Sequence, residues 1–294
     1  MSLTTVTTEQ TERARTLLGQ LVETRKGKIG FGVVAAIVVL AVLAPVIAPH
    51  DPIEQSLVDR LVAPSLEHPF GTDAYGRDIL SRILYGFRYS LLIGVVSVAI
   101  GTVIGVALGM VGGYYGGRVD TVVGRLIDVM LAFPFLLFAL FIVAVLGQSL
   151  MNVMIAVGIA TSPRFARLAR GDTLSVKEEP FVTAAKSMGR PNTKVMVEHL
   201  LPNIITPVLV MGSLNMGRAI IISAALSFLG LGVQPPTPTL GGILSDGRAF
   251  MELAPWVSIF PGLAITVAVL GFNLLGDAIR DVLDPKLQQG GGFT

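Results

Sequence analysis

The chain has 294 residues, of which 52% are hydrophobic and only 14% charged, and its formal net charge is +2. Soluble domains carry about 25% charged residues, so these proportions argue against a water-soluble core and against disorder. The near-neutral charge gives no field for nucleic acid, and the lack of cysteine excludes disulfides and thiolate metal sites. The three histidines, His50, His68 and His199, are far apart in sequence, so no metal site is predicted.

Uncharged runs of membrane-spanning length recur along the chain. One span needs about 20 apolar residues. The chain is therefore predicted to be an all-α membrane protein with six transmembrane helices, at 29–48, 91–117, 124–146, 149–167, 204–233 and 253–276. A polar break at 147–152 separates the third helix from the fourth. The prolines inside the spans are expected to kink them, at Pro134, Pro163 and Pro261.

The basic residues indicate the orientation. With six spans, 16 Lys and Arg residues fall on the side of the two termini and 5 on the other side. The positive-inside rule then places both termini in the cytoplasm of a multi-pass plasma-membrane protein. The expected units are tails at 1–28 and 284–294, a first helix with an outer loop at 29–87, and a five-helix domain at 88–283. That domain contains a cytoplasmic loop at 168–203.

The outer loop ends in a segment of helical periodicity. Apolar residues recur at helical spacing over 79–87, with Arg77, Arg82 and Arg88 interleaved. This pattern is typical of an amphipathic helix lying in the membrane interface before the second span. A helix that binds lipid head groups or a partner is the alternative interpretation.

The cytoplasmic loop has helix start and stop signals. Pro180 suits a first helical position, and Gly189 is placed to take the left-handed conformation after the helix ends. Pro191 enforces the stop. Asn192 or Thr193 can then cap a second short helix, which is expected to end before Pro202. The loop is therefore predicted to form two helices joined by a sharp turn outside the membrane.

The same loop carries a spaced pattern. Ala184-Ala185, Gly189 and Leu201-Pro202 resemble the Glu-Ala-Ala loop of ATP-binding-cassette (ABC) importer permeases, with the same spacing throughout. Thr183 stands where that family has glutamate, and His199 where it has isoleucine. The resemblance implies that this loop couples the permease to an ATPase. The residues that it assigns to coupling are Phe181, Thr183, Ala184, Ala185, Gly189, Leu201 and Pro202.

Three further stretches narrow the resemblance. Residues 44–52, 68–91 and 225–248 are similar to the second permease of the peptide, oligopeptide and nickel importers, although Ser223 replaces an acid common in relatives. The implied fold is the transmembrane domain of a type I ABC importer. The implied cargo is a dipeptide or short oligopeptide. Nickel, glutathione and other small solutes remain alternatives.

The resemblance also implies partners. These are a second permease, two ATPases that bind ATP and magnesium, and an extracytoplasmic solute-binding protein. The chain itself has no GxxxxGK[ST] sequence to bind nucleotide phosphates, and no cofactor is expected in it.

A charged residue lies inside the fifth span. Arg218 is near mid-membrane, where a charge is costly, so it should face protein or water. Met211 and Asn215 share its helical stripe. These residues are candidates for the transport pathway, and pairing of Arg218 with a carbonyl or the partner permease is the alternative.

Two other classes of protein fit less well. A secondary transporter needs ion-coupling carboxylates in broken helices, whereas Asp128 and Asp277 lie at span ends. An intramembrane enzyme needs a nucleophile–base pair or metal ligands, and the predicted spans contain none. The chain is therefore predicted to be a transport subunit and not an enzyme.

Overall fold

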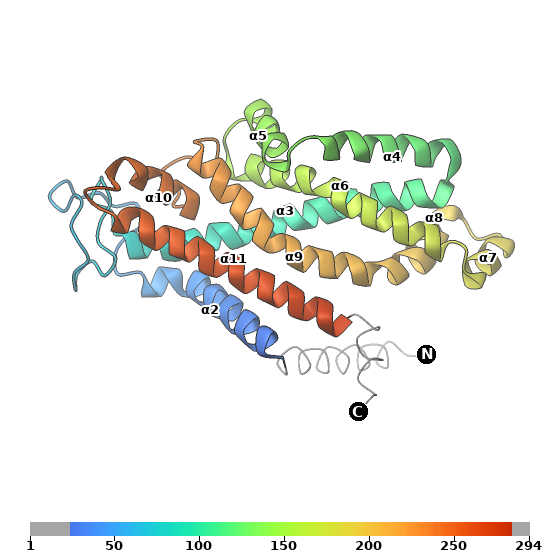
Figure 1. Cartoon of the computed structure of the whole chain (residues 1–294), viewed down its shortest axis with the longest axis horizontal. Coiled ribbons are helices and arrows are strands. Elements are labelled where there is room, and N and C mark those ends of the chain that lie inside the picture. Colours follow the sequence, from blue (N-terminus) through green and yellow to red (C-terminus); the bar gives the residue numbers. More distant parts are fainter. Residues whose placement is uncertain (1–23, 284–294) are drawn as a thin grey trace.

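The regular structure of the chain is helical throughout residues 24–283, which the computed structural model describes. Long helices pack side by side along the longest axis of the molecule (Figure 1). They are α2 (Arg25–Ile47), α3 (Ile79–Tyr115), α6 (Leu150–Val176), α9 (Leu201–Phe228) and α11 (Trp256–Leu283). The shorter helices are α4 (Gly117–Ala132), α5 (Phe135–Leu146), α7 (Pro180–Ser187), α8 (Asn192–Val195) and α10 (Leu240–Gly247).

The two ends of this bundle differ. The short helices α7 and α8 lie at one end, and α10 and the loop between α2 and α3 lie at the other (Figure 1). Between the ends, the largest buried apolar cluster forms where α3, α5, α6 and α9 meet, around Phe165 and Val157. The length of the bundle therefore separates these two regions.

Four helices in the described part are long and apolar enough to cross a membrane: α2, α3, α11 and the run Asn192–Phe228 that includes α9. The bent pair α4 and α5 makes a fifth candidate if it is counted as one span. The chain is thus an all-helical membrane protein with four to five candidate spans among residues 24–283. The remaining predicted span, 149–167, corresponds to the first part of the 27-residue helix α6.

The third predicted span is broken and not merely kinked. Residues 124–146 were expected to form one helix, but α4 and α5 meet at 95°. Pro134 has no N–H to continue the helix, and Phe133 before it takes an extended conformation with ψ of 135°. Pro163 and Pro261, by contrast, lie inside continuous helices.

The predicted polar break before α6 is confirmed. Gly147 takes a positive φ of 89° and closes α5. Ser149 then caps α6 by accepting a hydrogen bond from the Asn152 backbone N–H at 3.1 Å. The Asn152 side chain donates to the carbonyl of Leu146 at 2.7 Å. These polar residues therefore build a turn.

Glycines at four-residue spacing let α3 and α6 approach closely, as their spacing in the sequence predicts. A Cβ atom on Gly105 would lie 2.5 Å from the Ser162 carbonyl oxygen, and one on Gly109 would lie 2.3 Å from that of Ala166. Since real Cβ atoms do not approach backbone so closely, larger residues at either position would force the two helices apart.

The expected interfacial helix at 79–87 is instead the first part of α3. Helix α3 begins at Ile79 and continues without a break to Tyr115. Asp78 caps it, because its carboxylate accepts a hydrogen bond from the Ser81 backbone N–H at 2.8 Å. Arg82 is only 3% exposed. This arginine is therefore paired inside the protein and does not contact lipid head groups.

Candidate functional site

The α7–α8 element, residues 180–195, contains the predicted sharp turn. Pro180 occupies the first turn of α7, and Gly189 has a φ of +75° directly after the helix. The turn is closed by hydrogen bonds from the Gly189 N–H to the Lys186 carbonyl at 2.9 Å and from the Arg190 N–H to the Ala185 carbonyl at 3.3 Å. This pattern satisfies carbonyls at the helix end. The predicted role of Gly189 in the turn is confirmed.

The second short helix does not stop before Pro202. Helix α8 continues through a π-helical turn, Met196–Leu200, directly into α9. Pro202 cannot donate a hydrogen bond, and its ring crowds the carbonyl four residues earlier, so a locally wider turn accommodates it. The predicted cap is also wrong: Pro191 is the N-cap of α8 and Asn192 is its first residue. The turn is therefore joined rigidly to a membrane-crossing helix.

The inner face of the α7–α8 element packs against its own chain. Ala185 and Val182 are 1% and 0% exposed, in a cluster with Tyr114, Val195 and Leu200. Ala185, which was expected to face a partner, is therefore a core residue of this element. The reason is the helical period, which turns two adjacent alanines to different faces.

The outer face of the element is free in the isolated chain. Phe181 is 42% exposed and Met188 is 72% exposed. The other coupling candidates on this surface are Thr183, Ala184, Gly189 and Pro202, whereas Leu201 is half-buried. An apolar surface around a tight turn is a shape that fits a groove on another protein.

Polar contacts fix the α7–α8 element to the ends of the long helices. The Tyr114 hydroxyl at the end of α3 donates to Asn192 Oδ1 at 2.8 Å. The Lys186 ammonium lies 4.6 Å from the centre of the Tyr114 ring. Lys177, after α6, donates to the Gly113 carbonyl at 2.9 Å. The element is therefore attached to α3 through Tyr114 and to α9 through the π-helical turn, and Lys177 joins α6 to α3 beside it.

The candidate pathway residues share helix α9 but differ in exposure. Asn215 is 3% exposed and donates to the Met211 carbonyl at 2.7 Å. Its Oδ1 atom is buried with no partner within residues 24–283. Arg218 is exposed and forms no ion pair within the described chain. Arg164 on α6 lies near enough for the two charges to repel, and its guanidinium sits 4.9 Å above the Phe135 ring.

Sequence reasoning did not single out Arg164, because it lies near the end of the predicted fourth span, 149–167, and was counted with the cytoplasmic basic residues. The helical period of α6 carries it back into the bundle, beside α9. Two cations on neighbouring helices form a positive patch, which would attract a carboxylate.

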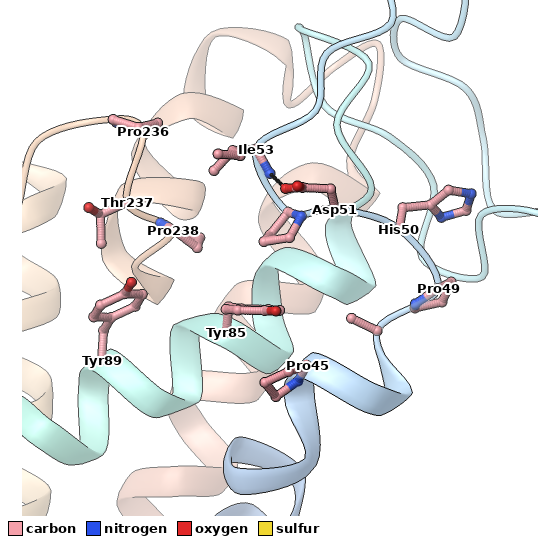
Figure 2. Close-up of a pocket in the computed structure, with 12 residues that line it drawn as sticks. Pro45, Pro49, His50, Asp51, Ile53, Tyr85, Tyr89, Pro236, Thr237 and Pro238 are labelled. Carbon is pink, nitrogen blue, oxygen red and sulfur yellow. Dashed lines mark hydrogen bonds between the residues drawn. The ribbon is translucent and has the colours of Figure 1, made fainter.

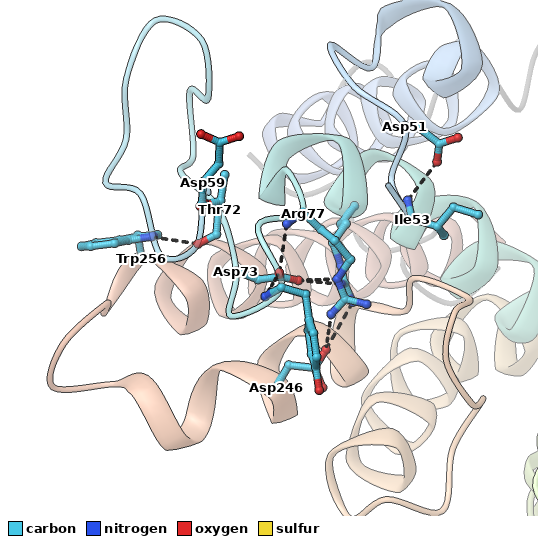
Figure 3. Close-up of polar contacts among 10 residues, drawn as sticks. Asp51, Ile53, Asp59, Thr72, Asp73, Arg77, Asp246 and Trp256 are labelled. Carbon is cyan, nitrogen blue, oxygen red and sulfur yellow. Dashed lines mark hydrogen bonds and ion pairs between the residues drawn. The ribbon is translucent and has the colours of Figure 1, made fainter. Parts of the chain in front are cut away.

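A buried arginine–aspartate network lies at the opposite end of the bundle (Figure 3). The Asp73 carboxylate accepts hydrogen bonds from Arg77 Nε at 2.7 Å and Arg82 Nη1 at 2.6 Å. Asp246 on α10 accepts from the same two arginines, at 3.0 and 3.3 Å. Burial raises the pKa of Asp246 above its usual value, and Arg77 opposes that effect. The network joins the outer loop, α3 and α10.

A cavity of about 570 Å³ opens beside this network. Its wall includes Tyr85 and Tyr89 of α3, Pro45 of α2 and the segment 236–238 (Figure 2). Rigid aromatic and proline surfaces of this kind are typical of surfaces that contact a partner or a ligand. Nearly all of this lining lies in the three stretches that carry the family resemblance, 44–52, 68–91 and 225–248, but nothing in the sequence predicts that these distant segments meet.

An all-helical bundle with four to five candidate spans in its described part, and a compact helix–turn–helix element at one end, defines a multi-pass membrane protein. The comparisons with known proteins give the transport class. Residues 101–289 match the family described as binding-protein-dependent transport system inner membrane component, and 20–64 match the N-terminal domain of oligopeptide transport permease C. The chain belongs to this permease family. The resemblance to the second permease of peptide importers is confirmed.

Curated relatives cover most of the chain. The dipeptide transport system permease protein DppC of Alkalihalophilus pseudofirmus is 44% identical over 92% of this chain and 88% of its own length. The glutathione transport system permease protein GsiD of Shigella flexneri is 50% identical over 87% and 84%. The chain is accordingly an ABC importer permease, a multi-pass protein of the bacterial inner membrane and a transport protein rather than an enzyme.

Solved structures share the fold. An inward-facing structure of the MetNI methionine ABC transporter matches with a TM-score of 0.55 at 17% identity, covering 69% of this chain and 97% of that one. A crystal structure of an amino acid ABC transporter with histidines gives 0.51 at 18% identity, covering 67% and 92%.

Proposed function

We propose that this chain forms half of the translocation pathway for dipeptides or short oligopeptides delivered by an extracytoplasmic binding protein. The observation that carries the proposal is the similarity to the dipeptide permease over 92% of the chain. Glutathione, itself a short peptide, is the second candidate, because the glutathione permease is 50% identical. Nickel has no comparable support among these relatives.

Uptake by the assembled importer tests this function. Vesicles would contain this chain with its companion permease, the ATPases and the binding protein, and accumulation of a labelled dipeptide would be measured with and without ATP. ATP-dependent accumulation that is lost when this chain is omitted is expected. Transport of glutathione without any dipeptide would favour the second candidate, and transport of neither would contradict the proposal.

The proposed complex contains a second permease and two ATPases, which hold ATP and magnesium. The exposed side chains of Phe181 and Met188 form the surface that would enter a groove on one ATPase. Their attachment to α3 and α9, through Tyr114 and the π-helical turn, supports transmission of ATPase motion to the pathway. No cofactor in this chain is needed for that role.

The proposed topology has six spans with both termini in the cytoplasm and the units 1–28, 29–87, 88–283 and 284–294. Helix α6 is the fourth span in chain order, and it is the one added to the five candidates described above. The second half of α6 carries charged residues, but it remains compatible with a span. Arg170 there pairs with Asp120 at 2.8 Å, and α6 packs against the side of α3 that carries Gly105 and Gly109.

Single cysteines test this topology cleanly, because the chain contains none. Leu57→Cys replaces a residue that is 78% exposed in the outer loop, and Ser187→Cys an exposed residue at the end of α7. An impermeant thiol reagent on intact cells should label position 57 and spare position 187, and both should react after permeabilisation. Equal labelling in intact cells would mean that α6 does not cross the membrane.

Arg218 is proposed to line the pathway with Arg164, where their charges would attract a peptide carboxylate. The Arg218→Leu variant is expected to lower uptake while the complex still assembles. Arg118→Leu, which removes an exposed arginine at the start of α4, is the charge-matched control and should transport normally. Normal uptake by Arg218→Leu would remove this residue from the pathway.

A further inference from the structure

Three potential metal ligands converge near the arginine–aspartate network. His50 follows α2, His68 lies in the outer loop, and Asp78 caps α3. One ligand atom from each lies within 4.8 Å of the other two. The sequence separation of the histidines argued against such a site, but the outer loop folds back and brings them together.

The distances suit a tetrahedral ion. Asp78 Oδ1 lies 3.0 Å from His68 Nδ1 and 3.8 Å from His50 Nδ1. In a tetrahedral zinc site with bonds of about 2.0–2.2 Å, neighbouring ligand atoms are about 3.4 Å apart. The two separations bracket that value, so an ion needs only small side-chain rotations to reach all three atoms.

One ligand atom is unpaired, and the carboxylate is held in place by hydrogen bonds. His50 Nδ1 is buried and has no hydrogen-bond partner in the described chain. Asp78 Oδ2 accepts hydrogen bonds from the Ser81 N–H and hydroxyl, both at 2.8 Å, whereas Asp78 Oδ1 is hydrogen-bonded to His68 Nδ1 at 3.0 Å, a contact that a shared ion would replace. Hydrogen bonds that hold a ligating carboxylate in place are typical of protein metal sites. Ser81 therefore orients the aspartate toward the histidines through the oxygen atom that would not bind the ion.

The surroundings favour a cation. The three residues line a cavity of about 250 Å³ whose wall also carries Glu54, Asp59 and Glu67. These carboxylates produce a negative potential, and the cavity has room for water as a fourth ligand. Two imidazoles and one carboxylate form a donor set typical of zinc, and nickel accepts imidazole as well.

We propose that His50, His68 and Asp78 bind one divalent transition-metal ion, with zinc as the preferred ion. The ion would tie the end of α2 to the start of α3 and close the outer loop between them. Such a site is structural and independent of the transported solute, so it goes beyond the proposed function. Its failure would leave peptide transport untouched as a proposal.

Zinc binding to the purified importer tests the site. The complex would carry no polyhistidine tag and would be stripped with chelator, and ZnCl₂ uptake would be measured by equilibrium dialysis with elemental analysis. Because the other subunits could bind zinc, the wild type is compared with variants of this chain alone. In His50→Gln and in His68→Gln, the affinity for one zinc per permease should fall by more than about tenfold, so that this ion is lost from the stoichiometry at low zinc. His199→Gln, which removes the remaining histidine, is the matched control and should bind as the wild type does.

Thermal stability provides an independent readout. Zinc should raise the Tm of the wild type and of His199→Gln but not of His50→Gln, since an ion that binds only the folded state stabilises it. His50 is 35% exposed in its side chain, so His50→Gln should fold and decides the question even if His68→Gln does not. Zinc uptake and Tm shifts that are the same in the wild type and His50→Gln would overturn the proposal, as would no saturable uptake by the wild type.

Discussion

Uptake should fall by more than about tenfold in the Gly189→Val variant, while the permease remains inserted at normal abundance. A Cβ atom at Gly189 would meet nothing within 4 Å, so the effect must come from the backbone, whose φ is +75°. A left-handed conformation costs an ordinary residue about 1–2 kcal/mol, and more for a β-branched one. That strain is too small to unfold the bundle, but it disfavours the turn that presents Phe181 and Met188.

Two controls separate backbone strain from side-chain bulk. Gly189→Asn should retain most of the uptake, because asparagine tolerates the left-handed region. Gly171→Val also places a valine where a Cβ meets nothing within 4 Å, but on the ordinary helical backbone of α6. Because it adds the same bulk without the backbone strain, its uptake should stay near that of the wild type. Wild-type uptake by Gly189→Val, with the ATPases still attached, would exclude the α7–α8 turn as the coupling site.

Ala185 requires a different interpretation from the one that the sequence suggests. A carboxylate introduced by Ala185→Asp would enter the buried cluster around Val182 and Leu200 and not a groove on a partner. Loss of transport in that variant would therefore report damage to the α7–α8 element itself. Ala184, which is exposed, is the better position for probing the contact with a partner.

Asp73→Asn is expected to destabilise the fold by about 3–5 kcal/mol, the cost of removing one partner from a buried ion pair. Asp73 is 0% exposed and holds Arg77 and Arg82, which are 5% and 3% exposed. Without the charge of Asp73, Asp246 is the one carboxylate of the network left to the two arginines. Burial disfavours the ionised form of Asp246, because it raises the pKa of that group. The outer loop and α10 should then loosen from α3, and the Tm of the detergent-solubilised permease should fall.

An exposed ion pair supplies the matched control. Asp128→Asn breaks the contact with Arg167, which has a similar length of 2.7 Å but side chains that are 67% and 60% exposed. Exposed pairs are worth about 0–1 kcal/mol, so the Tm should barely change. Equal shifts in the two variants would mean that burial of the Asp73 network adds nothing to stability.

Local patterns in the chain predict several features correctly. The uncharged run at 29–48 indicates α2, because a helix is the only way for one segment to satisfy its backbone in lipid. The spacing of Gly105 and Gly109 predicts a close helix contact, and Gly189 after a helix predicts the left-handed turn. Each of these depends on residues within a few turns of one another, so the physical cause lies within the pattern itself.

Contacts between distant segments could not be read from such patterns. Arg77 and Asp246 are 169 residues apart, and their pairing exists only because α10 packs on α3. His50 and His68 meet for a similar reason, since the outer loop folds back on α3. The 95° break at Pro134 likewise depends on packing, because Pro163 and Pro261 lie inside continuous helices. A proline weakens any helix locally. Whether the helix then stays continuous depends on its packing against neighbouring helices, which only the tertiary structure determines.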